Sequence, residues 1–157
     1  MKLCFAADRT LGKLAKWLRI LGFDTIFELD ASNKLFYEQL EPERVLLTRI
    51  AKLRDCFIAA KLVFIEADDV SAQLRQVIDE LAIARKDIRV FSMCLKCNSL
   101  IIGVNKQSVY GLVPDYIWQT HDDFHMCRQC ERIYWAGSHV ERSRVVIEKL
   151  FAMQNED

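Results

Sequence analysis

The chain has 157 residues, 52% of them hydrophobic, which is enough for one domain with a real core and a small additional unit. Its 22 Lys and Arg residues balance its 22 Asp and Glu residues, so net charge does not favour nucleic acid or a membrane surface as a partner, and any basic surface must be local. No apolar run approaches the roughly 20 residues of a membrane span, and an acid follows the first apolar residues too early for a signal peptide. We therefore expect a cytoplasmic protein without membrane contact, whose six cysteines stay reduced.

The first 90 residues alternate between short apolar segments and longer segments with helical periodicity. The expected strands are KLCFAA, DTIFEL, RVLLTR and KLVFIEA. Residues 10–22 and 68–86 each place their apolar residues on one helical face, and Gly22 is a natural stop for the first helix. Strands that alternate with helices predict an α/β fold with a parallel sheet flanked by helices, with functional sites at the carboxyl ends of the strands.

From residue 91 onward the helical periodicity ends. Two C-x2-C pairs flank the segment VNKQSVYGLVPDYIWQ, which we expect to be a loop. A last helix is expected over about residues 141–153. Its apolar face would consist of Val145, Val146, Leu150 and Phe151. The chain is thus predicted to contain an α/β domain over residues 1–90 and, over residues 91–157, a small second domain with a C-terminal helix.

Four cysteines have the paired spacing of a zinc site. Cys94 forms one pair with Cys97, and Cys127 forms the other with Cys130. Each pair can bind zinc through a tight turn, and two such turns complete a tetrahedral site of four thiolates. The alternative is four unrelated buried cysteines, which would not account for the spacing. A closed four-sulfur site leaves no position for water, so the zinc would be structural. The segments SLIIGV and RIYWAG would then be strands of a zinc ribbon.

Aspartates follow three of the four expected strands. They are Asp8, Asp30 and the pair Asp68 and Asp69. Parallel strands bring such ends to one edge of the sheet, where clustered carboxylates repel one another unless a cation lies among them. Mg²⁺ or Mn²⁺ is the usual cation of such a site, and a phosphodiester is its usual substrate. Each aspartate alone could be a helix N-cap, but their repetition at one structural position favours a catalytic metal site.

A basic face lies beside the first aspartate. Arg9, Lys13 and Lys16 follow Asp8 in the sequence and fit contacts with RNA phosphates. A stripe of this kind is also typical of a solvated helix face. Arg49, at the end of the third expected strand, belongs to the same group of expected RNA contacts.

Aromatic and basic residues also follow the second cysteine pair. Trp135, His139 and Arg142 could contact single-stranded RNA, in which aromatic side chains commonly stack on bases. Alternatively, Trp135 and Tyr134 would pack the ribbon against the α/β domain, because a small ribbon lacks a core of its own. His139 could also cap the helix that follows it.

These motifs together resemble those of the Mut-seven C-terminal ribonuclease domain family, a PIN-like nuclease fold joined to a zinc ribbon. The resemblance runs from about residue 2 to 140 and is carried by FAADRTLGKLAKWLRILGFDT, RVLLTR, FSMCLKCNSL, VPDYI and FHMCRQCERIYWAGSH. It implies a metal-dependent ribonuclease that acts on RNA, in which clustered acids hold Mg²⁺ or Mn²⁺ ions that activate a water. Asp8 matches the first acid of the family, Asp30 an acid after the second strand, and Asp68 or Asp69 a further acid. The resemblance also implies a homodimer as one possible assembly.

One position departs from the family pattern. The third strand of the family is followed by T-R-D, whereas this chain has Thr48, Arg49 and Ile50, and isoleucine cannot bind a metal ion. The loss of one ligand weakens a shared metal site severely. Two functions therefore stay open: a ribonuclease with impaired activity, and a non-catalytic RNA-binding adaptor on the same scaffold with a structural zinc. A DNA-binding ribbon is less favoured, because no recognition helix stands out.

Overall fold

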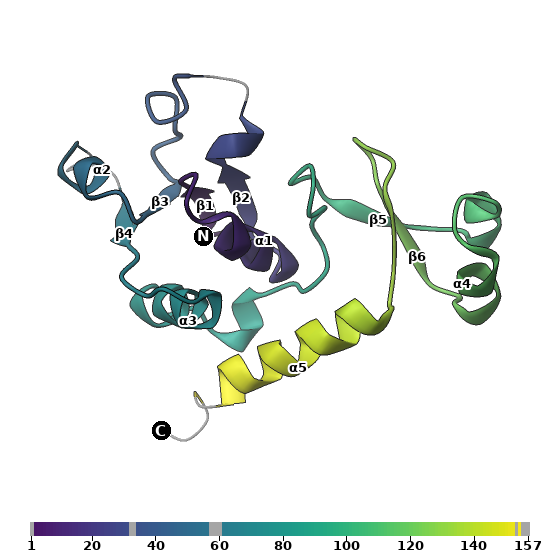
Figure 1. The fold of residues 1–157 in the computed structure, drawn as a ribbon. Helices are drawn as coiled ribbons and strands as arrows, with labels where there is room; N and C mark the ends of the chain where they lie inside the picture. The colour runs from purple at the N-terminus through teal and green to yellow at the C-terminus, as the bar shows by residue number, and fades with distance from the viewer. Residues whose placement is uncertain (1, 32–33, 57–60, 153, 155–157) are drawn as a thin grey trace. The chain divides into compact units, whose positions relative to one another are not determined.

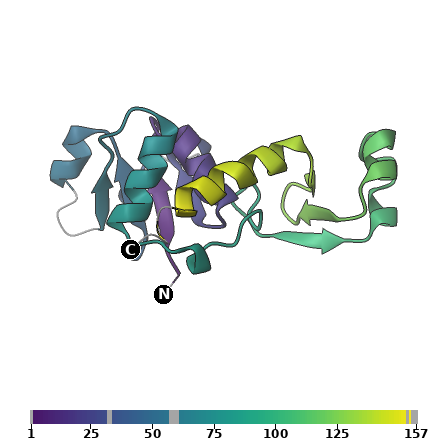
Figure 2. The same cartoon turned by 90° about the horizontal axis from the view of Figure 1, so that it is seen from below.

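The computed structural model describes residues 2–31, 34–56, 61–152 and 154. By its internal contacts the chain divides into two compact units, Met1–Asn98 and Ser99–Asp157. Figure 1 shows the ribbon coloured along the chain, and Figure 2 shows it from below. None of the helices in the described part of the chain is both long enough and apolar enough to cross a bilayer. The domain boundary predicted after residue 90 stays a prediction.

A four-stranded parallel sheet with the strand order β2-β1-β3-β4 is the centre of the first unit. Its strands are β1 (Cys4–Ala7), β2 (Asp24–Phe27), β3 (Val45–Thr48) and β4 (Leu62–Phe64). Each lies within one of the four apolar segments of the sequence, so the predicted α/β fold with a parallel sheet is confirmed. Because all pairings are parallel, the carboxyl ends of the four strands lie at one edge of the sheet.

Helices cover this sheet in the way that the periodicity predicts. Helix α1 (Gly12–Ile20) packs on β1 and β2 and contacts α3 (Val70–Glu80), while the short α2 (Ala51–Cys56) contacts β3 and β4 (Figure 1). Gly22 follows α1 with φ at 94°, in the left-handed region that glycine tolerates. A Cβ atom at this position would lie 2.2 Å from the carbonyl oxygen of Arg89, so the backbone of Arg89 packs directly on the end of α1.

The segment after β2 covers part of the sheet. Ile26, Ala6, Leu46 and Leu62 lie side by side across the four strands. Phe36 is buried with Ala6 and Leu46, and Tyr37 and Leu40 pack against the same cluster. The described residues 34–40 thus close the core of the first unit at this cluster.

The amino edge of the sheet contains a buried arginine. Arg44 donates hydrogen bonds to the carbonyl oxygen of Phe5 at 3.0 Å and to Asp24 Oδ1 at 2.8 Å, and it also pairs with Glu41. Burial alone would raise the pKa of Asp24, but hydrogen bonds from Arg44 and Asn98 outweigh it and hold this pKa below its usual value of 3.8. Asp24 is therefore ionised in the folded protein at neutral pH.

The second unit contains a three-stranded antiparallel sheet with the order β5-β6-β7. Strands β5 (Ile101–Val104) and β7 (Ile133–Trp135) follow the two cysteine pairs, as predicted, and β6 (Phe124–Cys127) ends at the first cysteine of the second pair. The segment expected to be a loop instead contains the 3-10 helix η3 (Lys106–Val109) and α4 (Asp115–Thr120). In Figure 1, α4 lies beside the end of β6 at which this strand begins.

Residues 106–120 give this small sheet a hydrophobic cluster of its own. Its buried residues are Val109, Val113, Ile117 and Phe124, and Val104, Trp118, Ile133 and Trp135 pack against them. The expectation that the ribbon lacks a core of its own is therefore wrong. Trp135 packs within the ribbon, because η3 and α4 bring apolar side chains onto the face of the sheet that carries it.

The C-terminal helix α5 spans Ser138–Ala152 and so begins three residues before the predicted start. Leu150 and Phe151 are buried as predicted, together with Ile147. Val145 is 55% exposed, so its predicted place on the buried face is wrong. Residues two positions apart on a helix point in nearly opposite directions, which is why Val145 and Ile147 cannot share a face.

Candidate functional site

Charged or polar side chains lie at the end of each strand, or follow it, at the carboxyl edge of the parallel sheet. We call this row the rim, and it consists of Asp8, Arg9, Glu28, Thr48, Arg49 and Asp68. Polar contacts join neighbours along the strand order. Arg9, after β1, donates its backbone N–H to Glu28 Oε2 at 2.8 Å, and its guanidinium lies 3.5 Å from Glu28 Oε1. Arg49, after β3, donates to Asp68 Oδ1 at 2.6 Å. The acids after β1, β2 and β4 therefore belong to one continuous row of contacts.

Asp8 is the centre of the rim and is completely buried. Its Oδ1 accepts hydrogen bonds from the backbone N–H of Thr10 at 2.6 Å and from the Thr10 hydroxyl at 2.5 Å. Its Oδ2 accepts from the Thr48 hydroxyl at 2.6 Å and from the backbone N–H of Arg49 at 2.8 Å. A carboxylate has about four lone-pair positions, so donors from the protein itself occupy all the hydrogen-bond acceptor positions of Asp8. These bonds fasten the end of β1 to the end of β3.

This arrangement does not fit Mg²⁺ or Mn²⁺. Asp8 could bind a cation only after one of its four donors had moved away, and the Asp68 side chain is 94% exposed and paired with Arg49. Ile50 adds no ligand, and the guanidinium groups of Arg9 and Arg49 already neutralise Glu28 and Asp68. Among the residues that the structure describes, the predicted aspartates do not form a group of three or more potential metal ligands. Their catalytic assignment stays a prediction.

The other two predicted aspartates have partners of a different kind. Asp30 ends the 3-10 helix η1 (Glu28–Asp30), is half exposed, and accepts a hydrogen bond from Arg19 Nη2 at 3.2 Å. Asp69 is the N-cap residue of α3, and its side chain accepts from the backbone N–H of Ala72 at 3.0 Å. For Asp69 the alternative interpretation as a helix cap is thus confirmed.

Glu28 is a rim acid that the sequence analysis overlooked. Its Oε2 also accepts a hydrogen bond from the hydroxyl of Tyr37. Burial, followed by this contact with the Glu28 carboxylate, raises the pKa of Tyr37, so the phenol stays protonated. The expected strand DTIFEL included Glu28 and so pointed to Asp30, but β2 ends at Phe27, and Glu28 follows it directly, as Asp8 follows β1.

The predicted RNA contacts fall on both units. Lys13 and Lys16 are exposed on α1 and form no ion pair with the residues that the structure describes. Trp135 is partly buried in the ribbon cluster, while His139 and Arg142 are exposed on α5. Their assignment to RNA binding stays a prediction.

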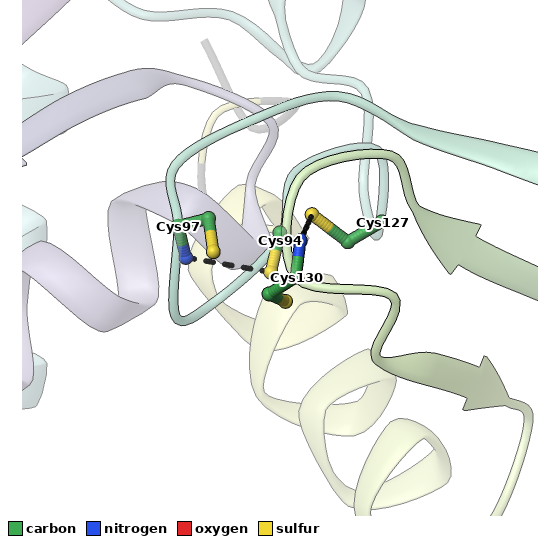
Figure 3. Close-up of side chains that lie close together, drawn as sticks. All are labelled: Cys94, Cys97, Cys127 and Cys130. Carbon is green, nitrogen blue, oxygen red and sulfur yellow. Dashed lines mark hydrogen bonds between the residues drawn. The ribbon is translucent and has the colours of Figure 1, made fainter.

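The cysteine cluster has the geometry of a metal site. The four sulfur atoms all lie within 4.8 Å of one another; they belong to Cys94, Cys97, Cys127 and Cys130. Figure 3 shows the side chains converging from two turns. Backbone N–H groups donate to two of the sulfurs: that of Cys97 to Cys94 Sγ at 3.4 Å, and those of Gln129 and Cys130 to Cys127 Sγ at 3.4 and 3.5 Å. Such bonds stabilise thiolates.

The donor set fits zinc. In a tetrahedral site with Zn–S bonds of about 2.3 Å, the sulfurs are about 3.8 Å apart, which agrees with this spacing. None of the four cysteines is in a disulfide. The four-cysteine cluster can therefore bind a zinc ion, and the predicted ligand set is brought together.

Comparison with protein-family models gives a match to the Mut7-C RNAse domain over residues 3–147. The matched range contains the parallel sheet, both cysteine pairs, the ribbon and the first part of α5. Comparison with curated proteins and with solved structures gives no match.

Proposed function

The chain belongs to the Mut7-C RNase domain family, and on this premise we propose that it is a ribonuclease whose RNA substrate binds along the rim. The observation that carries this proposal is the unbroken row of contacts from Glu28 to Asp68 across the four strand ends. In open parallel sheets, ligands bind outside the carboxyl ends of the strands.

Arginine and lysine side chains beside the rim would hold the RNA backbone. The Arg9 side chain is 58% exposed and the Arg49 side chain 34%, so a phosphate could reach both. A bound phosphate would replace Glu28 as the partner of Arg9 and Asp68 as the partner of Arg49, and guanidinium groups bind phosphate well. Lys13 and Lys16 would add further phosphate contacts, so we expect RNA binding to weaken as salt concentration rises.

Dependence on Mg²⁺ or Mn²⁺ follows from the family resemblance, in which Asp8, Asp30 and Asp68 or Asp69 would hold the ion. The geometry of the rim does not support that ligand set, so no step of the proposed reaction is assigned to a bound ion. Glu28 is a rim acid that could exchange a proton with the substrate, whereas Tyr37, which donates to it, keeps its own proton because its pKa is raised.

A second function, the RNA-binding adaptor, is favoured by one specific observation. Ile50 stands where the family has an acid, and Asp8, which would need that acid as a co-ligand, is saturated by Thr10, Thr48 and the backbone of Arg49. An intact phosphate-binding rim without a metal site would bind RNA and leave it uncut.

A cleavage assay with end-labelled single-stranded RNA separates the two functions. Wild type and Ile50→Asp would be incubated with Mn²⁺, Mg²⁺ or EDTA, and fluorescence anisotropy would report binding to the same RNA. Ile50→Asn is the matched control, because it has nearly the same shape as Ile50→Asp without the charge.

Each outcome of these assays decides between the ribonuclease and the RNA-binding adaptor. Cleavage by wild type supports the ribonuclease, and the EDTA arm shows whether an ion is needed. Cleavage by Ile50→Asp but not by Ile50→Asn would show an impaired ribonuclease with the rest of its site intact. Binding without cleavage by any of the three proteins would establish the adaptor. Absence of both binding and cleavage would overturn both functions.

A further inference from the structure

Arg19 is a buried arginine in the last turn of α1, with three acceptors from three different segments. Its Nε donates to the carbonyl oxygen of Thr25 in β2 at 2.9 Å, and its Nη2 donates to Asp30. Its Nη1 donates to the carbonyl oxygen of Leu95 at 2.8 Å. A buried guanidinium is costly to desolvate, so three well-placed acceptors indicate a fixed geometry.

The third of these acceptors lies inside the first cysteine turn. The Leu95 carbonyl belongs to the peptide group between Leu95 and Lys96, which is the middle of the turn from Cys94 to Cys97. A fixed peptide at the middle of this turn restricts the backbone between the two cysteines. Arg19 thus acts on the metal-binding turn without contacting a sulfur.

Asn98 makes a second attachment on the far side of the same turn. Its Oδ1 accepts from the backbone N–H of Thr25 at 2.8 Å, and its Nδ2 donates to Asp24 Oδ1 at 2.7 Å. Its φ of 57° is in the left-handed region, which asparagine tolerates better than most residues. The turn from Cys94 to Cys97 is therefore held inside by Arg19 of α1 and, directly after Cys97, by the bonds of Asn98 to β2.

We propose that Arg19 is a positioning residue for the zinc site, which presets the Cys94–Cys97 half of the site and links it to Asp30. Because one guanidinium holds both the Leu95 carbonyl and Asp30, zinc occupancy and the Arg19–Asp30 ion pair stabilise each other. By reciprocity, a change at either one alters the other by the same factor. The proposal concerns zinc affinity, so it can fail or hold independently of RNA cleavage.

The test is a measurement of zinc affinity in the full-length chain. Wild type and Arg19→Lys would compete for zinc with a chromogenic chelator. Lysine keeps the charge but lacks the planar fork that reaches three acceptors, so we expect affinity to fall about 10-fold to 100-fold, as for other residues that orient metal ligands from outside the coordination shell. Asp30→Asn, which leaves the bond from Arg19 to Leu95 in place, should give a smaller loss in the same direction. Arg49→Lys is the matched control, since Arg49 lies at the rim, and it should change zinc affinity less than about 2-fold.

Two further measurements separate positioning from general stability. The thermal stability of the zinc-free proteins reports whether Arg19→Lys merely weakens the fold, and the cadmium NMR signal of cadmium-loaded protein reports the geometry at sulfur. A shifted cadmium signal together with the lowered zinc affinity supports the proposal. If Arg19→Lys lowers the stability of the zinc-free protein while zinc affinity and the cadmium signal stay as in wild type, the proposal is overturned. If Arg19→Lys does not fold, Asp30→Asn takes its place, because it removes the ion pair with Arg19, and an unchanged zinc affinity in that variant overturns the proposed link between the ion pair and the zinc site.

Discussion

The rim and the cysteine cluster both bring together ligand-bearing residues from distant parts of the sequence, but they satisfy those residues in opposite ways. At the rim, protein donors fill the lone pairs of Asp8 and arginines neutralise Glu28 and Asp68. In the cysteine cluster, four sulfurs face one another within 4.8 Å. The cluster presents four sulfurs that can bind one zinc ion, whereas the acids of the rim already have arginine side chains as their cationic partners. Convergence of acids at a sheet edge is therefore weaker evidence for a metal than convergence of sulfurs.

Removal of a cysteine should have the largest effect on the folded protein. We expect Cys127→Ser to lose the zinc ion and to unfold the ribbon, because the binding free energy of a structural zinc ion, on the order of 10 kcal/mol, is also folding free energy. Zinc released on denaturation and a thermal unfolding scan would measure the two effects, with about one zinc per chain expected for wild type. Cys4→Ser, outside the cluster, is the matched control and should keep its zinc. Equal zinc contents in Cys127→Ser and wild type would mean that the cluster is not the zinc site.

Asp8→Asn tests whether the rim is held together by this carboxylate. An asparagine would place an NH₂ group against existing donors, such as the backbone N–H of Arg49, so we expect the free energy of unfolding to fall by about 3 kcal/mol. Urea unfolding of both proteins would measure this difference in free energy. Asp69→Asn is the control, since asparagine caps a helix as well as aspartate does and should change stability little. If Asp8→Asn were as stable as wild type but lost RNA cleavage, Asp8 would be a catalytic residue rather than a structural one.

A smaller and pH-dependent effect is expected at the opposite edge of the sheet. The pKa of Asp24 is depressed in the folded state, so its ion pair with Arg44 contributes stability above the usual pKa of 3.8 and loses it as pH falls through the lower folded value. Asp24→Asn should be about 1 kcal/mol less stable than wild type at pH 7, since this side chain is partly exposed and screened by water. The difference should shrink below about pH 4. Urea unfolding at several pH values would measure it, and a constant difference would show that the charge of Asp24 contributes nothing.

Local patterns predicted the parts of the fold that depend on local interactions. The strands were predicted from short apolar runs, and α1 and α3 from the helical spacing of apolar residues, each within about a dozen residues. The zinc ligands were predicted from two closely spaced pairs of cysteines. The segment 104–119 has no clear period, because η3 and α4 are short and are stabilised by packing on Phe124 rather than by propensity. Its helices therefore could not be read from the sequence.

The partners of the site residues depend on contacts between distant positions. Thr48 and Arg49 lie about 40 residues from Asp8 in the sequence, and only the pairing of β1 with β3 brings their donors to its carboxylate. Arg19 interrupts an otherwise apolar helix face, which was a visible signal, but its acceptor at Leu95 is 76 residues away. The strand ends could be predicted to converge, whereas the way in which each charge is satisfied could not.

The attachment of residues 95–98 to β2 also bears on where this chain can be shortened. β2 is an outer strand of its sheet, and the N–H and C=O groups of Thr25 on its open side are occupied by Asn98 and Arg19. A fragment that ended after residue 90 would keep the whole parallel sheet but uncover the Thr25 N–H group on that strand. Uncovered edge strands pair with other chains, so such a fragment should aggregate more readily than one that extends through Asn98.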